Sequence, residues 1–186
     1  MTPKPSRLLE IYDITDNRKD YPSSRIPSYE LFELTFQVKH EGAINPYLPY
    51  IEIPSSGGEK DLGISVDASF TQDNWKTVYK QPAFYYQEFE EQVKDGREWF
   101  YPTGKASWKV RFSPNQAGLW QVKLTARDAS GVVETNSISF NVVPSSSHGF
   151  IRVSQADPRY FEYDDGKYFP ALGYNLNYRN LDWINP

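Results

Sequence analysis

The chain has 186 residues, long enough for one full domain and part of a second, and it carries a formal net charge of −4 and no cysteine. The acidic balance leaves no basic field for a phosphate backbone, so we expect no nucleic-acid partner, and without cysteine there is no disulfide, thiolate metal site or cysteine nucleophile. Aromatic residues make up 16% of the chain and 14 residues are proline, which favours an all-β fold of short strands joined by turns.

Several segments in the first half of the chain are typical of strands. Residues 8–14 predict a first strand that ends before the polar residues 15–20. Apolar and polar side chains alternate in residues 29–39 and again in residues 64–70, which indicates strands with one buried face. A less regular strand is expected at residues 75–79. The apolar rows are Phe32, Leu34, Phe36 and Val38, then Ile64, Val66, Ala68 and Phe70.

A dense aromatic run follows at residues 82–89, PAFYYQEF. If Phe84 and Tyr86 face the core of a strand pair, then Tyr85 and Phe89 face outward. Flat sugar faces pack on exposed rings, so Tyr85 and Phe89 are candidates for sugar stacking. Packing in a core or between domains is the commoner role of such rings and is the alternative.

The residues after this run, EEQVKDGREW, predict a short helical turn before Gly96. Residues 101–104, Tyr-Pro-Thr-Gly, then predict a connection into the next strand. The acidic side chains of Glu88, Glu90 and Glu91 are expected on a solvated face and not as catalytic acids.

The clearest strands lie between Trp108 and Val143, where three apolar rows alternate with polar residues. The link at residues 113–118 is too long for a two-residue turn and is expected to cross between sheets. Gly118 and Trp120 then stand where immunoglobulin-like sandwiches carry a small residue and a tyrosine. The rows are Trp108, Val110 and Phe112; Trp120, Val122, Leu124 and Ala126; and Ile138, Phe140 and Val142.

These strands predict an immunoglobulin- or fibronectin III-like antiparallel β-sandwich over residues 1–145. The core of this sandwich is expected to contain Trp108, Val110, Trp120, Val122, Phe36, Phe140 and Val142. The composition changes at residues 144–149, Pro-Ser-Ser-Ser-His-Gly, which indicates a domain boundary.

Residues 146–186 are expected to hold a linker and a C-terminal β-hairpin extension. Its strands are predicted at residues 160–163 and 168–174, joined by the turn Asp164–Lys167. The residues after Asn175 are expected to pack poorly or to contact a neighbouring molecule. Lying against the sandwich, the hairpin is expected to bury Phe161, Phe169 and Leu172.

Four segments follow one another in a distinctive order: NPY, PAFYYQEF, WKVRFSPNQAGLW and HGFIRVSQADPRYFEYDDGKYFPALGYN. Together they resemble the amino-terminal part of a group of bacterial glycoside hydrolases, in which an uncharacterised immunoglobulin-like domain precedes a catalytic (β/α)8 barrel. The resemblance covers residues 29–175. Its most specific piece is GFIRVS followed by DPRYF and the DDG turn.

The resemblance implies a non-catalytic N-terminal accessory module that docks on and supports a catalytic barrel. The two catalytic carboxylates would lie on later barrel strands, past Pro186, so we assign no catalytic residue here. Residues 173–175 resemble the end of the first barrel strand, which makes Tyr174 and Asn175 candidate substrate-binding residues of the intact enzyme. A secreted, periplasmic or cell-surface location is also implied, although the start of the chain lacks a signal-peptide core.

Two other functions fit the same fold. A carbohydrate-binding module would hold a polysaccharide on two or more coplanar exposed rings, and an adhesion or protein-interaction sandwich would have no enzyme attached. A docking module instead needs an apolar patch near its carboxyl-terminal linker.

The remaining polar residues indicate no further chemistry. Asp164 and Asp165 are adjacent in a turn, whereas paired glycosidase carboxyls lie about 5–10 Å apart. His40 and His148 are too few for a histidine-rich site, so we expect no metal and no cofactor. No apolar stretch approaches about 18 residues, and we therefore expect no membrane insertion.

Overall fold

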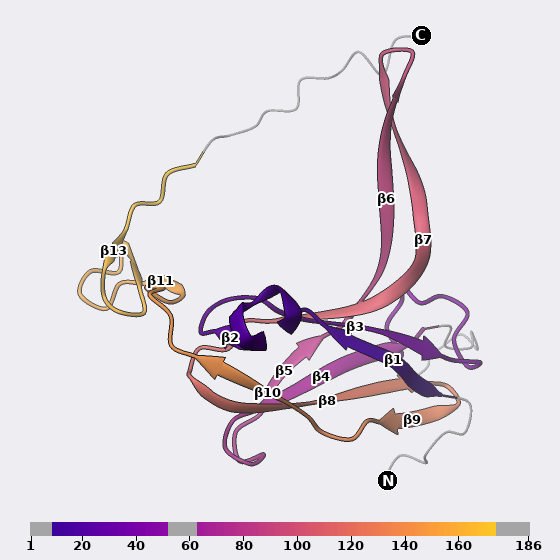
Figure 1. Ribbon diagram of the computed structural model, residues 1–186, viewed down its shortest axis with the longest axis horizontal. Helices are drawn as coiled ribbons and strands as arrows, with labels where there is room; N and C mark the ends of the chain where they lie inside the picture. The colour runs from indigo at the N-terminus through magenta and orange to yellow at the C-terminus, as the bar shows by residue number, and fades with distance from the viewer. Residues whose placement is uncertain (1–8, 52–62, 174–186) are drawn as a thin grey trace. The chain divides into compact units, whose positions relative to one another are not determined.

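The computed structural model describes residues 9–51 and 63–173. In these residues the secondary structure is almost entirely β, with thirteen strands and two short 3-10 helices, so the predicted all-β class is confirmed (Figure 1). The chain divides into two compact units, Met1–Ser145 and Ser146–Pro186.

The first unit is a sandwich of two sheets. The first sheet contains β1 (Glu10–Asp16), β3 (Phe32–Lys39), β7 (Arg97–Phe112) and β6 (Phe84–Lys94), side by side in this order and antiparallel. The second contains, in order, β2 (Ile26–Pro27), β10 (Ile138–Val143), β8 (Gly118–Asp128), β4 (Ser65–Thr71) and β5 (Tyr79–Pro82), with β9 (Gly131–Glu134) paired to β8. Two 3-10 helices, η1 (Arg18–Asp20) and η2 (Pro22–Ser24), connect β1 to β2.

The apolar rows predicted from alternation meet between these two sheets. Phe32 of β3 stacks on Phe140 of β10 with ring centroids 4.0 Å apart, and Phe70 of β4 stacks on Phe112 of β7 at 4.1 Å. Each pair joins one sheet to the other. All seven predicted core residues are buried: Phe36, Trp108, Val110, Trp120, Val122, Phe140 and Val142.

The link at residues 113–118 crosses from β7 in one sheet to β8 in the other, as predicted. Next to it, the indole N–H of Trp120 donates to the carbonyl oxygen of Gln116 at 2.9 Å. Because Trp120 is only 1% exposed, this bond satisfies a polar group that burial removes from water. It resembles the tyrosine-to-backbone bond at the same corner of immunoglobulin-like sandwiches.

The prediction of a strand at residues 75–79 is wrong, since the backbone turns there and β5 begins only at Tyr79. The hydroxyl oxygen of Thr71 accepts the N–H of Trp75 at 3.0 Å, and the Asp73 carboxylate accepts the N–H of Thr77 at 2.8 Å. These side-chain acceptors satisfy backbone donors locally and hold the turn in place of a strand.

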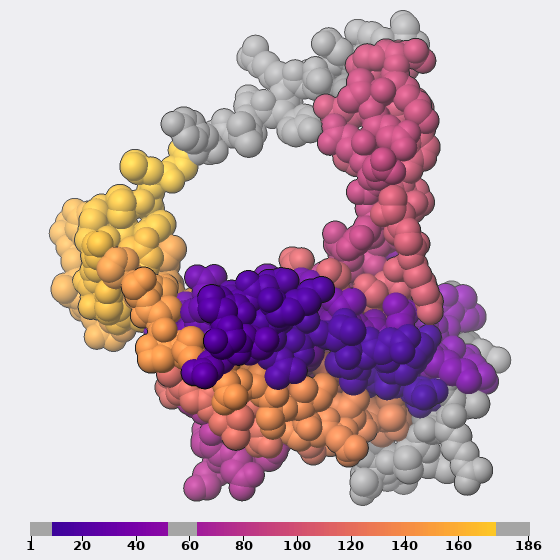
Figure 2. Space-filling view, in the orientation of Figure 1, coloured from indigo at the N-terminus to yellow at the C-terminus, as the bar shows by residue number. Residues whose placement is uncertain are grey.

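The helical turn expected before Gly96 is also wrong. β6 and β7 continue beyond the sandwich as an antiparallel ribbon, and Asp95 and Gly96 form its two-residue turn with φ angles of 54° and 73°. Positive φ at both positions matches the type I′ turn that Asp-Gly pairs favour. The connection expected at residues 101–104 is part of β7. We call residues 88–103 the arm, which projects from the sandwich (Figures 1 and 2).

The second unit contains a small antiparallel sheet of β11 (Ile151–Val153), β12 (Phe161–Tyr163) and β13 (Tyr168–Phe169). The predicted turn joins β12 to β13, and in it the N–H of Gly166, whose φ is 83°, donates to the carbonyl oxygen of Tyr163 at 2.9 Å. β13 is shorter than the strand predicted at residues 168–174. The prediction for the residues after Asn175 lies outside the described part of the chain.

The second unit does not bury the three hairpin side chains that were predicted to be covered, Phe161, Phe169 and Leu172. Phe161 is 44% exposed and Leu172 is 93% exposed, while Phe169 is half-buried with its ring 5.4 Å from that of Tyr163. Strands of two or three residues present too little area to form a core of their own.

Candidate functional site

Tyr85, predicted to face outward for sugar stacking, instead faces the core. It lies opposite Trp108 in the β6–β7 pairing, and the two ring centroids are 5.4 Å apart. Opposite residues in an antiparallel pair share one face of the sheet, and Trp108 is only 4% exposed. The predicted direction was therefore wrong because the register of β6 against β7 decides it.

A cleft of about 390 Å³ lies on the sandwich beside Tyr85. The ring of Tyr47, which is 67% exposed, meets the ring of Tyr85 edge to face at 5.2 Å. The carbonyl oxygen of Leu48 accepts the N–H of Ile64 at 2.8 Å, which holds this wall of the cleft to the start of β4. The lining comes from residues 46–49, 64–67 and 82–85 together with Trp108.

The rings of Phe84 and Tyr86 face away from the core and are covered by cations. Arg111 lies over Phe84 at 5.2 Å and Lys109 over Tyr86 at 4.8 Å. Both cations also bind Glu33, at 2.7 Å and 2.9 Å respectively. Burial raises the pKa of Glu33, but the hydrogen bonds from Lys109 and Arg111 outweigh burial and keep its pKa below the ordinary value. This outer face is an ion-pair network on the sheet.

Phe89, the second predicted sugar-stacking residue, lies on the arm and is 57% exposed. A register shift between Tyr86 and Glu88 separates the arm from the part of β6 that packs on the sandwich. Tyr85 and Phe89 are therefore not brought together as one platform. The arm exposes other large apolar side chains that the prediction missed: Val93, Trp99, Phe100 and Tyr101.

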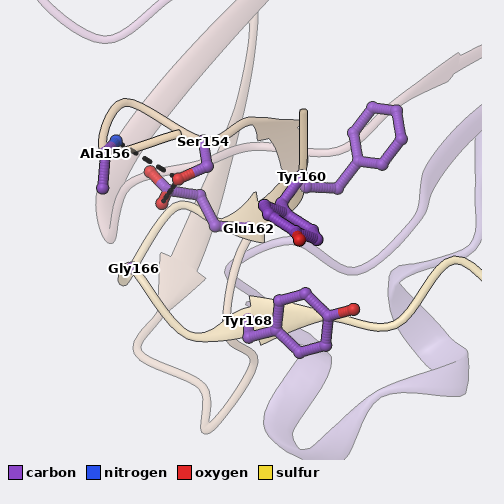
Figure 3. A pocket seen from close by; sticks show the side chains of 7 residues that line it. Ser154, Ala156, Tyr160, Glu162, Gly166 and Tyr168 are labelled. Atoms are coloured by element: carbon purple, nitrogen blue, oxygen red, sulfur yellow. Dashed lines mark hydrogen bonds between the residues drawn. The ribbon is translucent and has the colours of Figure 1, made fainter. Parts of the chain in front are cut away.

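A second pocket, of about 410 Å³, lies on the small sheet of the second unit (Figure 3). The rings of Tyr160 and Tyr168 are 50% and 59% exposed, with centroids 6.2 Å apart. The Glu162 carboxylate lies beside them and turns toward Ser154 in Figure 3. The remaining lining residues are Ala156, Phe161 and Gly166. Sequence reasoning missed this group, although the register implied by the DDG turn places Glu162 opposite Tyr168.

Glu162 is held as a carboxylate by its neighbours. It accepts hydrogen bonds from the Ser154 hydroxyl at 2.7 Å and the N–H of Gln155 at 3.4 Å, and it pairs with Arg152 at 3.0 Å. The Ser154 hydrogen bond is the main cause that keeps the pKa of Glu162 below its ordinary value. A carboxyl that stays ionised is poorly suited to donate a proton as a general acid.

The other face of this sheet is apolar, and one of its residues, Phe161, also borders the pocket. The pairing aligns Ile151 with Tyr163, Val153 with Phe161, and Phe161 with Phe169, so these five side chains share one face, which we call the apolar face of the second unit. Ile151 and Val153 are 49% and 54% exposed. An exposed apolar patch near the carboxyl-terminal linker is what a docking module requires.

The aspartates of the DDG turn are structural. Asp164 accepts the N–H of Phe150 at 2.9 Å, and Asp165 accepts the N–H of Lys167 at 3.0 Å and lies 2.6 Å from the Nδ1 atom of His148. The backbone bond from Lys167 is the largest cause of the lowered pKa of Asp165, and His148 adds to it. Both carboxylates therefore hold the turn and its linker.

The other predicted site features are as follows. Tyr174 and Asn175, the candidate substrate-binding residues, lie outside the described residues. Across residues 9–51 and 63–173, no three histidine, aspartate or glutamate side chains gather in a group that could hold a metal ion. The helices in that same part of the chain are too short to cross a membrane.

Comparison with known proteins finds one weak similarity. No protein-family model matches the chain, and no curated protein matches it. A crystal structure named as that of a "putative glycoside hydrolase" from Bacteroides vulgatus is similar to 78% of this chain, with 19% sequence identity and a TM-score of 0.46. The chain spans about a fifth of that protein, 21% of its length.

Proposed function

We propose that this chain is a non-catalytic accessory module of a glycoside hydrolase, and that it docks on and supports the catalytic barrel of that enzyme. The sequence segments that resemble the amino-terminal part of bacterial glycoside hydrolases support this proposal. The most specific of them, GFIRVS, DPRYF and the DDG turn, contain β11, the start of β12 and the turn before β13.

The apolar face of the second unit is the observation that carries the proposal. A three-stranded sheet this short is not stable with one apolar side in water, so Ile151, Val153 and Phe161 favour burial against a larger body. The body that the sequence resemblance implies next to this segment is the catalytic barrel. The exposed face and the sequence resemblance therefore both support the proposal that the chain docks on a barrel.

The docking role is tested in the protein translated from this chain together with its downstream coding sequence. Ile151→Ser with Phe161→Ser should lower the unfolding temperature of the barrel, while Tyr168→Ser, on the opposite side of the same sheet, should leave it unchanged. Equal effects of both variants would contradict docking through the apolar face. A downstream sequence without a barrel that carries two carboxylates at strand ends would refute the enzyme itself.

The chain by itself should not hydrolyse glycosides. Glu162 and Asp165 are bound in hydrogen bonds that keep them ionised, and the pair that glycosidases need is not identified among the described residues. The purified chain is therefore expected to release no product from aryl glycosides. Turnover that disappears when one Glu or Asp of the chain is changed to its amide would overturn the non-catalytic role.

A carbohydrate-binding module is the second candidate, favoured by the cleft beside Tyr85. Tyr47 presents an exposed ring there, and the exposed carboxylate of Asp67 lies in the same lining. One exposed ring and a polar acceptor can form a single sugar subsite, although the rings of Tyr47 and Tyr85, inclined at 82°, are not the coplanar pair expected of such a module. Calorimetry with soluble glucans, xylans and mannans would show binding that Tyr47→Ala removes and Tyr160→Ala keeps; no binding at all would leave only the docking role.

A further inference from the structure

The arm is a two-stranded ribbon that the sandwich does not support. β3 pairs with β7 only from Trp108 to Phe112, so residues 88–103 have no third strand beside them among the described residues. Isolated two-stranded hairpins are at best marginally stable in water. A long ribbon of this kind with large exposed side chains favours a partner that covers it.

The two faces of the arm differ in chemistry. On one face, the Lys94 amine donates to the Tyr101 hydroxyl at 3.0 Å and lies 4.4 Å from the centre of its ring, so this face has contacts of its own. The other face follows from the pairs Phe89 with Pro102, Glu91 with Phe100, and Val93 with Glu98. We call these six residues the Phe89 face.

The Phe89 face combines an apolar strip with two free carboxylates. Phe89, Val93 and Phe100 are 57%, 67% and 61% exposed. The side-chain carboxylates of Glu91 and Glu98 have no hydrogen-bond or ion-pair partner in the part of the chain that the structure describes. The arm as a whole has five acidic and two basic residues, a net charge of −3. Its complement is therefore apolar and basic.

We propose that the Phe89 face binds an extended protein segment that turns both apolar side chains and lysine or arginine side chains toward the ribbon, at every second residue. Side chains of an extended segment repeat on one face at every second residue, which matches the spacing of the cross-strand pairs on the ribbon. The acidic charge disfavours nucleic acids and anionic lipid surfaces. A second copy of the arm would bring four like charges together, so self-association is disfavoured as well. This binding does not depend on the proposed enzyme.

The proposal is tested on the full chain with two short blocked peptides in which every second residue is serine. The residues between the serines, which share one side of the extended peptide, alternate valine with lysine in one peptide and valine with glutamate in the other. The lysine peptide should bind, and amide exchange should slow in residues 88–103 only. Glu91→Lys with Glu98→Lys should lower the affinity for the lysine peptide by about tenfold or more and should create binding to the glutamate peptide. Val93→Ser with Phe100→Ser should also weaken binding of the lysine peptide, since it removes the apolar strip.

A matched control carries the same charge change on the other side of the ribbon. Glu88→Lys with Glu90→Lys should change the affinity for the lysine peptide by about threefold or less. Equal losses in both charge variants, or protection outside the arm, would overturn the proposal. So would a dimer of the free chain that Phe100→Ser dissociates, because a second copy would then be the occupant. Near-ultraviolet circular dichroism confirms that each variant keeps the buried core.

Discussion

Strand β7 passes through two surroundings, and its side chains are exposed very differently in them. In the sandwich, Trp108 and Val110 are 4% and 0% exposed because the second sheet covers them. In the arm, Trp99 and Phe100 are 49% and 61% exposed, although β6 pairs with β7 in both stretches. Pairing with one neighbour therefore does not bury a strand; a facing sheet does.

The largest expected difference in the free energy of unfolding is between a tryptophan variant in the sandwich and one in the arm. Trp120→Ala should lower the free energy of unfolding by about 3–5 kcal/mol, because it leaves a large cavity and removes the bond to Gln116. Trp99→Ala should change it by about 0.5 kcal/mol or less. Urea denaturation of both variants measures the difference. A loss below about 1 kcal/mol for Trp120→Ala would contradict its burial.

A smaller difference in the free energy of unfolding is expected between the removal of a buried carboxylate and the removal of an exposed one. Asp128 is 2% exposed and accepts the N–H groups of Gly42 at 3.0 Å and Ser130 at 2.7 Å. Asp128→Ala should cost about 1–3 kcal/mol because these donors lose their acceptor. Glu91→Ala in the arm should stay within about 0.5 kcal/mol, and a larger loss there would show that the arm is part of the cooperative unit.

The next effect depends on pH. The pKa of Glu33 is lowered in the folded state, so its contact with Lys109 and Arg111 stabilises the fold above the ordinary glutamate pKa and is lost as the pH falls through the lowered value. The contribution is about 1 kcal/mol or less, since Arg111 is half exposed and solvent screens the pair. Stability of the original chain should therefore fall more steeply than that of Glu33→Gln on acidification below about pH 5. Parallel curves would contradict this role.

The smallest global effect is expected at the tip of the arm. Gly96 has a φ of 73° with open space around it, so Gly96→Ala meets only backbone strain of about 1 kcal/mol. The strain should open the ribbon without touching the sandwich. Amide exchange should accelerate in residues 88–103 while the global free energy of unfolding changes by about 0.5 kcal/mol or less. Faster exchange in β8 would mean that arm and sandwich unfold together.

Alternation alone is enough to predict the strands in the middle of the sandwich. Residues 32–38, 64–70 and 120–126 place an apolar side chain at every second position, and the structure buries all of these side chains except Val38, which is half-buried. The sequence also predicts that residues 113–118 cross between the two sheets, because the length of this link and its proline exclude a tight hairpin. In these cases one local signal and the tertiary fold agree.

The arm and the candidate sites depend on information that is not local. The EEQVK segment favours a helical turn by composition, but pairing with the residues after Gly96 makes it a strand, and only the Asp95-Gly96 turn signals this in the sequence. The side on which Tyr85 lies depends on which residue of β7 is opposite, and the register shift after Tyr86 changes that relation for Phe89.

By itself, then, the sequence determines the all-β class, the buried rows of the sandwich and the turn at Asp165-Gly166, because each rests on spacing or on a preferred φ angle within a few residues. Only the tertiary structure decides which rings are covered. The exposure of Tyr47, Tyr160 and Phe100 depends on whether another sheet or another strand lies over them, and residues close in the chain do not supply that cover.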